Sequence, residues 1–179
     1  MNIPDQKECF NIIKKNKMMD HIIKHSITVS NVSGFLAIRL KKTFPKLNIE
    51  LARSAGLLHD ITKTRSFKTG EKHSETGGQL LCDLGYPETG DIIRQHVFLD
   101  HYNNTPPVIE AEIINYSDKR VLHDKIVPLE ERLDYIYDRY VTNKKFIKRF
   151  DFMKKNTYNL EKKIFAYLDF KPSDIAALI

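Results

Sequence analysis

The apolar residues of this chain recur every three or four residues, which is the spacing that buries one face of an α-helix. The segment after Asn48 shows the pattern clearly, because Leu51, Ala55, Leu58 and Ile61 share one helical face and Asn48 is a suitable N-cap. No stretch alternates apolar and polar residues as a half-buried strand does. The sequence therefore predicts an all-α fold, a compact bundle of several helices.

Breaks in this pattern divide the chain into segments. The pattern predicts helices over Ile22–Leu40, from Ile49 to the His59-Asp60 pair, from about Ser74 to Leu84, over Pro87–Phe98 and over Ile109–Leu122, with two or three more from Pro128 onward. The polar stretch 64–74, which contains Gly70, is expected to be a loop, as is the stretch 99–107.

The length of 179 residues suits one compact domain. The two cysteines, Cys9 and Cys82, have no metal-binding or redox spacing, which suits a reducing compartment. The first residues lack the apolar run of a secretion signal, and no stretch reaches the roughly 20 apolar residues of a membrane span. We therefore expect a cytoplasmic protein with no membrane partner.

The formal net charge of +6 raises the question of nucleic-acid binding. Much of the excess falls late in the chain, at Lys144, Lys145, Lys148, Arg149, Lys154, Lys155, Lys162 and Lys163. Apolar residues at helical spacing separate these positions, so we interpret them as the solvated face of a helix. This distribution weakens the nucleic-acid interpretation. A general positive field can also concentrate an anionic small substrate without contacts to bases.

Histidine and aspartate side chains carry the chemistry. Neutral imidazole offers a lone pair to a metal ion, and aspartate supplies anionic oxygens that can bridge two ions. His59 and Asp60 are adjacent at a predicted helix end, where both can reach one ion from different sides. His25 upstream and Asp118 downstream are the candidates that would complete the coordination sphere.

The order His25, His59-Asp60, Asp118 resembles that of the HD-domain phosphohydrolases, an all-helical superfamily named for its His-Asp doublet. The resemblance covers roughly residues 21–124. It implies a metal-binding HD-type helical domain over residues 1–127. Residues 128–179 would then be a C-terminal helical extension that packs on the same domain or forms a homodimer contact.

Further histidines sharpen the resemblance. His73 and His96 lie where two-metal members of the superfamily have additional ligands, and His101 is a less certain candidate for the same ion. The pattern is most similar to that of bacterial enzymes that cleave diadenosine tetraphosphate symmetrically, which implies a nucleotide substrate and a di-iron centre. The residues alone leave iron, manganese, cobalt, nickel and zinc undistinguished.

Two other branches of the superfamily fit less well. The stringent-response hydrolases have an acidic pair shortly after the doublet, whereas this chain has Ile61-Thr62-Lys63-Thr64. The cyclic-dinucleotide phosphodiesterases have a Gly-Tyr-Pro signature, but here Gly85-Tyr86-Pro87 precedes His96. We interpret that tripeptide as a helix stop followed by a helix start.

The resemblance implies a divalent ion or an ion pair held by His25, His59, Asp60, His73, His96 and Asp118. Such a site would lower the pKa of a water molecule and polarise a phosphoryl oxygen. Asp60, as the bridging ligand, and Lys63, as a cation that offsets developing charge, are the catalytic candidates. Lys63 and Arg120 are the candidates for binding substrate phosphate, with an exposed surface arginine as the alternative for Arg120.

Two other functions stay open. One is a metal- and nucleotide-binding sensor without catalysis. The other is a nucleic-acid-binding accessory protein that uses the basic C-terminal helices. Each histidine or aspartate alone has an ordinary structural explanation, and we assign only a surface or hydrogen-bonding role to His21 and His123. The order of the ligand types over nearly a hundred residues favours the metal-dependent hydrolase.

Overall fold

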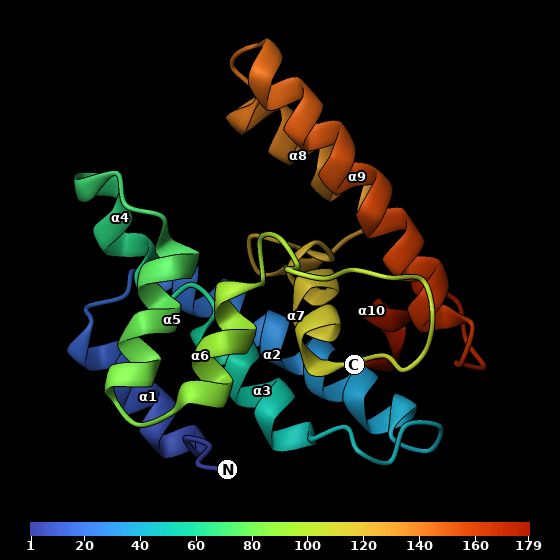
Figure 1. Ribbon diagram of the computed structural model, residues 1–179, viewed down its shortest axis with the longest axis horizontal. Helices are drawn as coiled ribbons and strands as arrows, with labels where there is room; N and C mark the ends of the chain where they lie inside the picture. Colours follow the sequence, from blue (N-terminus) through green and yellow to red (C-terminus); the bar gives the residue numbers. More distant parts are fainter.

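The computed structural model describes residues 1–179, except for the side chain of Lys145. The helices are α1 (Gln6–Lys15), α2 (Asp20–Leu40), α3 (Ile49–Leu58), α4 (Lys63–Thr69), α5 (His73–Asp83), α6 (Pro87–Arg94), α7 (Glu110–Asp118), α8 (Leu129–Tyr140), α9 (Lys144–Phe165), the 3₁₀ turn η1 (Pro172–Asp174) and α10 (Ile175–Leu178). The strands β1 (Val121–Leu122) and β2 (Lys125–Ile126) pair antiparallel. The predicted all-α bundle is confirmed (Figure 1).

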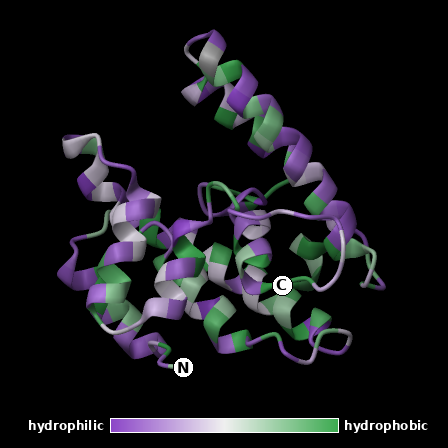
Figure 2. Ribbon diagram, viewed as in Figure 1, coloured by the Kyte–Doolittle hydropathy of each residue, from purple (hydrophilic) through white to green (hydrophobic). Residues whose placement is uncertain are grey.

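Helix α2 is central in the bundle, and α3 and α7 pack against it. One apolar core joins the first half of α2 to α1, α3, α5 and α6, and includes Ile22, Leu58 and Ile93. A second core joins the rest of α2 to α7 and the end of α9, and includes Leu36 and Ile164. Figure 2 shows that hydrophobic residues gather in the helices of this body. The two cores together fix the ends of α3, α5, α6 and α7.

Close helix crossings depend on glycine at two places. A Cβ at Gly56 in α3 would lie 2.6 Å from the Cα of Ser30 in α2, so no larger residue fits there. A Cβ at Gly90 in α6 would lie 2.6 Å from the carbonyl oxygen of Gly78 in α5. The second crossing brings the start of α5 close to the end of α6.

Helices α8 and α9 form a hairpin that projects from the body (Figure 1). A small apolar cluster around Leu133 and Phe150 joins the two helices. At its base, Nζ of Lys163 lies 2.6 Å from Oε1 of Glu112 in α7, and both side chains are buried. This ion pair holds the C-terminal half of α9 against the body.

Lys163 corrects the expectation that the basic residues of the C-terminal helices all lie on a solvated face. Its side chain is buried, whereas Lys144, Lys148, Arg149, Lys155 and Lys162 are exposed and Lys154 is half-buried. A buried lysine requires a partner, and the sequence pattern does not reveal Glu112 as that partner.

The polar stretch after the His-Asp pair also differs from its prediction. Part of the expected loop is the helix α4, which buries none of its side chains. Without an apolar face it has no periodicity to detect, and only its end is marked in the sequence, by Gly70 with a left-handed backbone at φ 71°.

Other differences concern helix ends. The expected helix Ile109–Leu122 stops at Asp118, and the strands that follow are too short to show alternation. The expected helix Pro87–Phe98 stops at Arg94, so His96 lies in the turn beyond α6. The N-cap role predicted for Asn48 is confirmed, because its side chain accepts a hydrogen bond from the backbone N–H of Leu51.

Helix α1 is not among the predicted helices, although the sequence does mark its start. Asp5 and Glu8 form a reciprocal capping box at its start, and this spacing of acidic residues is typical of a helix N-terminus. None of the helices in the described part of the chain combines the length and the apolar composition that a membrane span requires.

Candidate metal centre

The candidate ligands lie at the ends of helices that converge on one place. His59 caps the C-terminus of α3 and Asp60 follows it, while His73 begins α5 and Asp118 ends α7. His96 lies just beyond α6, and His25 in the second turn of α2 faces the group. The structure therefore brings together the six residues predicted as ligands, which are His25, His59, Asp60, His73, His96 and Asp118.

Three of the histidines are oriented by backbone carbonyls. Nδ1 lies 2.8 Å from the Gly56 oxygen for His59, 2.6 Å from the Ile93 oxygen for His96, and 2.8 Å from the His123 oxygen for His25. A carbonyl only accepts, so Nδ1 is the donor in each ring and the lone pair is on Nε2. This arrangement, with the second nitrogen held by the backbone, is typical of metal-binding histidines.

The carboxylate of Asp60 lies between the two halves of the group. Its Oδ2 is 3.4 Å from Nε2 of His59, and its Oδ1 is 3.2 Å from Nε2 of His73 and 3.6 Å from Nε2 of His96. Ligand atoms of His25, His59 and Asp60 lie within 4.8 Å of one another, as do those of Asp60, His73 and His96. Asp60 thus belongs to two triads that could each hold an ion.

Asp118 adds a second carboxylate to the triad that contains His25. Its Oδ1 lies 3.2 Å from Nε2 of His25 and 3.7 Å from Nε2 of His59. Both aspartates therefore place a carboxylate oxygen close to Nε2 of His59. This half of the centre offers two imidazoles and two carboxylates, a donor set that suits a divalent transition metal.

The surroundings keep three of the ligands, Asp60, Asp118 and His96, in metal-binding protonation states. Burial by itself raises the pKa of Asp60, but Lys63 and His59 outweigh it and hold that pKa well below its usual range. Burial also raises the pKa of Asp118, and Lys119 and His25 outweigh it in the same way. Burial lowers the pKa of His96 to about 4, so that its imidazole is neutral at pH 7. His59 differs, because Asp60 raises its pKa although burial lowers it.

Two buried ligand atoms test whether these residues fit a metal ion. Nε2 of His59 and Oδ1 of Asp60 are buried and make no hydrogen bond among the described residues. Leaving such atoms without a partner costs about 1–3 kcal/mol each in the absence of another interaction. Their near neighbours are other candidate ligand atoms, so the residues fit a bound divalent ion.

Lys63 touches the centre directly. It begins α4, and its Nζ lies 2.7 Å from Oδ2 of Asp60. Burial is the largest effect and lowers the pKa of Lys63, but the charges of Asp60 and Asp118 and the hydrogen bond to Asp60 together raise it by more, so the ammonium stays charged. A cation therefore lies beside the carboxylate that the two triads share.

A cavity of about 400 Å³ opens beside the centre. The candidate ligands His73, His96 and Asp118 line its floor, α4 forms one wall with Phe67, and α8 and α9 form the other with Tyr140. The sequence resemblance ended near residue 124, yet the C-terminal hairpin supplies much of this wall. That contribution depends on how the hairpin packs, which the residue pattern does not specify.

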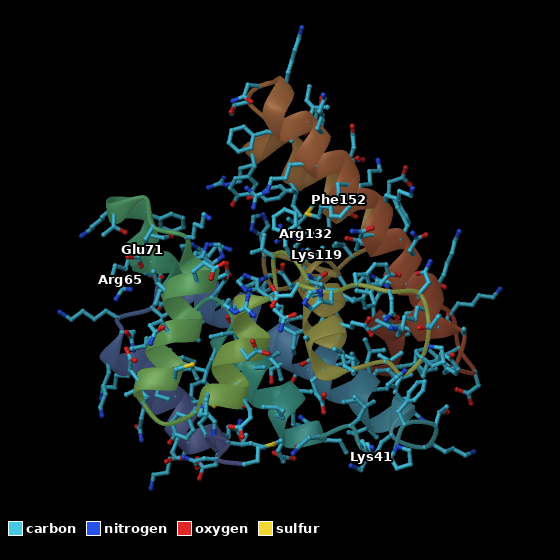
Figure 3. All side chains as sticks on the ribbon, viewed as in Figure 1. Lys41, Arg65, Glu71, Lys119, Arg132 and Phe152 are labelled. Atoms are coloured by element: carbon cyan, nitrogen blue, oxygen red, sulfur yellow. The ribbon has the colours of Figure 1, made fainter. Side chains whose placement is uncertain are left out.

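Sequence reasoning also missed two cations in this cavity. Lys119 is fully buried, donates to the carbonyl oxygen of His96, and has Nζ 3.4 Å from Oδ2 of Asp118. Arg132 in α8 is only 9% exposed, with Nη2 3.7 Å from Oδ1 of Asp118 and a buried Nε that makes no hydrogen bond. Figure 3 labels both where the hairpin meets the body. Lys119 had a sequence signal, since it follows Asp118 directly.

Arg120 does not lie on this cavity, and the alternative of an exposed surface arginine is wrong. Its buried guanidinium donates to the carbonyl oxygens of Val127 and Pro172 and to the hydroxyl of Tyr116. These bonds tie the C-terminal segment to α7. The donors that a phosphate would need are thus engaged within the protein.

The remaining histidines have different surroundings. His101 is exposed and belongs to neither triad. His123 occupies the turn between β1 and β2 with φ 56°, and its carbonyl orients His25. His123 therefore supports the centre through its backbone, whereas we expected only a surface or hydrogen-bonding side chain.

Comparison with known proteins agrees with this geometry. The model of the HD domain matches residues 22–121, which is more than half of the chain. The chain belongs to the HD-domain family. HD domains are metal-dependent hydrolases as a rule, so the match and the two triads support each other.

The relatives of this HD-domain protein have diverse names. An uncharacterized protein of Methanocaldococcus jannaschii is 26% identical over 163 residues, which are 84% of this chain and 95% of that protein. Ribonuclease Y of Alkaliphilus metalliredigens is 37% identical over 99 residues, which are 55% of this chain and 19% of the ribonuclease. A tRNA (cytidine(56)-2'-O)-methyltransferase of Picrophilus torridus is 28% identical over 145 residues, 74% of this chain and 40% of the enzyme.

The chain thus spans about a fifth of this ribonuclease and two fifths of this methyltransferase. No solved structure matches it.

Proposed function

We propose that this HD-domain protein is a metal-dependent phosphohydrolase that cleaves a phosphoester or phosphoanhydride of a nucleotide-like substrate. The observation that carries the proposal is the position of Asp60, whose carboxylate belongs to both triads of buried ligands. A buried carboxylate between two sets of histidines is the arrangement expected for a bimetallic hydrolytic site.

The protein's own residues would divide the work. His25, His59 and Asp118 would hold one ion and His73 and His96 the other, with Asp60 bridging them. Divalent ions held there would lower the pKa of a water molecule and polarise a phosphoryl oxygen. Lys63 and Arg132 would stabilise charge on the phosphate, because both are cations that line the cavity beside the ligands.

The cavity supports an anionic substrate with an apolar part. Its cations are Lys63, Lys119, Arg132 and Arg149, against the single carboxylate of Asp118, and its aromatic side chains are Phe67, Phe98, Tyr140, Phe146 and Phe150. Phosphate suits the former and a nucleobase the latter. Diadenosine tetraphosphate, which the sequence resemblance implies, stays a candidate, although none of the three relatives described above is named for it.

The proposal is tested by metal analysis of anaerobically purified protein, followed by hydrolysis assays on the same sample. The substrates are p-nitrophenyl phosphate, bis-p-nitrophenyl phosphate, ATP and diadenosine tetraphosphate. We expect turnover that a chelator abolishes and that added Mn²⁺ or Fe²⁺ restores. Tight nucleotide binding without turnover of any substrate would instead indicate the sensor, and activity that survives complete metal removal would contradict the proposal.

A further inference from the structure

A second cavity adjoins the first at the candidate metal centre. It measures about 500 Å³ and is lined by residues around the start of α5, the turn beyond α6 and the middle of α9. Four residues line both cavities, which are His73, Val97, Phe98 and Arg149. The candidate ligand His73 therefore stands where the two cavities meet.

Their sizes indicate more than one binding unit. Small-molecule sites measure about 300–1,000 Å³, so each cavity alone is large enough for one nucleoside. A phosphate monoester of a single nucleoside would occupy one cavity and leave the other unused. A substrate with a nucleoside on each side of the scissile phosphate would occupy both.

The linings have complementary chemistry. Phe146 in the first cavity is 43% exposed and Phe152 in the second is 61% exposed, so each presents a free aromatic surface. Arg149 stands between them, with its Cζ 4.3 Å from the centroid of the Phe98 ring. Exposed aromatic rings with cations between them are the features that bind successive bases and the phosphate joining them.

The second cavity is lined by both acidic and basic side chains. Arg94 is engaged with Asp91 and Asp100, and Glu75 adds a further carboxylate. Lys72 and Arg149 are its other cations. The cavity is thus nearly balanced in charge, which suits a neutral nucleoside unit better than a second phosphate. Figure 3 labels Phe152 on α9.

We propose that the substrate consists of two nucleoside units joined through phosphate, one in each cavity, with the scissile phosphate at the junction beside His73. This inference rests on the proposed phosphohydrolase function. In the reaction the oxygen of one water molecule bonds to phosphorus, and the bond from phosphorus to one ribose oxygen breaks. That oxygen leaves as a hydroxyl with a proton from the water, so the products are a phosphate monoester and a free hydroxyl.

The test compares kcat/KM of the Mn²⁺-loaded protein for three substrates. They are the dinucleotide pApA, the mononucleotide AMP and the single-stranded RNA A12, a chain of twelve adenosine nucleotides. We expect pApA to be cleaved at least about 10-fold more efficiently than AMP, because stacking of the second base contributes about 5- to 100-fold. If A12 is cleaved better than pApA, the two nucleoside units belong to the end of an RNA strand. If pApA is cleaved as well as A12 or better, the substrate is a free dinucleotide. Both results support the shared chemistry.

Variants separate this inference from a structural effect. In Phe152→Ala the ratio of kcat/KM for pApA to that for p-nitrophenyl phosphate should fall about 5- to 100-fold, and Phe152→Tyr should restore it. Phe10→Ala is the matched control, since Phe10 is an exposed phenylalanine on α1 outside both cavities, and it should leave the ratio unchanged.

Two results would overturn the inference. AMP turnover equal to that of pApA, with a Phe152→Ala ratio equal to wild type, would overturn it while leaving the phosphohydrolase intact. No metal-dependent turnover of any ester would overturn both.

Discussion

Nζ of Lys63 lies 2.7 Å from Oδ2 of Asp60, the carboxylate that both ligand triads share. The ammonium is therefore positioned to offset negative charge that would develop beside this shared carboxylate. We predict that Lys63→Met lowers kcat about 100-fold in the metal-loaded protein, as loss of one fixed charge-stabilising donor does. Steady-state kinetics measure this, with metal content determined on the same sample.

Lys63→Arg is the matched variant, because it keeps the charge while changing its geometry. It should recover part of the lost kcat. Equal rates in wild type and Lys63→Met at equal metal content would show that Lys63 only neutralises Asp60 in the metal-free protein.

Local sequence predicted much of the fold and of the candidate site, because both depend on short-range patterns. Helical periodicity identified α2, α3 and α5, and helix ends are where ligands from separate segments can converge. The doublet His59-Asp60 carried the most information, since adjacent residues at a helix end can face one ion from different sides.

What the sequence did not predict depends on long-range packing. Arg132 in α8 lies 3.7 Å from Asp118 at the end of α7, and Arg120 donates to the carbonyl oxygen of Pro172, which lies 52 residues further along the chain. Helix α4 buries nothing and so has no apolar face to detect. Periodicity specifies which face of a helix is buried, but not which partner covers it.

Substitution of Arg120 tests whether this residue stabilises the fold or binds the substrate. Arg120→Met removes a guanidinium that donates to Val127, Tyr116 and Pro172, and it should lower the free energy of unfolding by about 2–3 kcal/mol. Urea denaturation measures this. Arg65→Met, which removes an exposed pair with Glu71, should cost less than about 1 kcal/mol. A KM that rises in Arg120→Met at unchanged stability would instead assign Arg120 to the substrate.

Gly56 tests the crossing that positions His59. A Cβ there would lie 2.6 Å from the Cα of Ser30, a backbone atom that cannot move aside cheaply. We predict that Gly56→Ala lowers the free energy of unfolding by about 1–3 kcal/mol. Asn31→Ala, at an exposed position on α2, should change it by less than about 0.5 kcal/mol. Equal stability of both variants in urea would show that α2 and α3 separate easily.

The two cysteines should differ in reactivity. Burial raises the pKa of the Cys9 thiol to about 12, whereas Cys82 is exposed. At pH 8 the thiolate fraction of Cys9 is about one in ten thousand, so iodoacetamide should modify Cys82 in the native protein and Cys9 only after unfolding. Peptide mass spectrometry distinguishes the sites. Equal labelling of both in the native protein would contradict the buried position of Cys9.

The bridging role of Asp60 is the central claim, and Asp60→Asn tests it most directly because the amide keeps the size of the carboxylate but removes its charge. Metal content and hydrolysis of bis-p-nitrophenyl phosphate are measured on wild type and variant after anaerobic loading with Mn²⁺. We predict about two ions per chain in wild type. In the variant we predict loss of bound metal and a rate at least about 1,000-fold lower. A variant that retains both the ions and the wild-type rate would contradict the account.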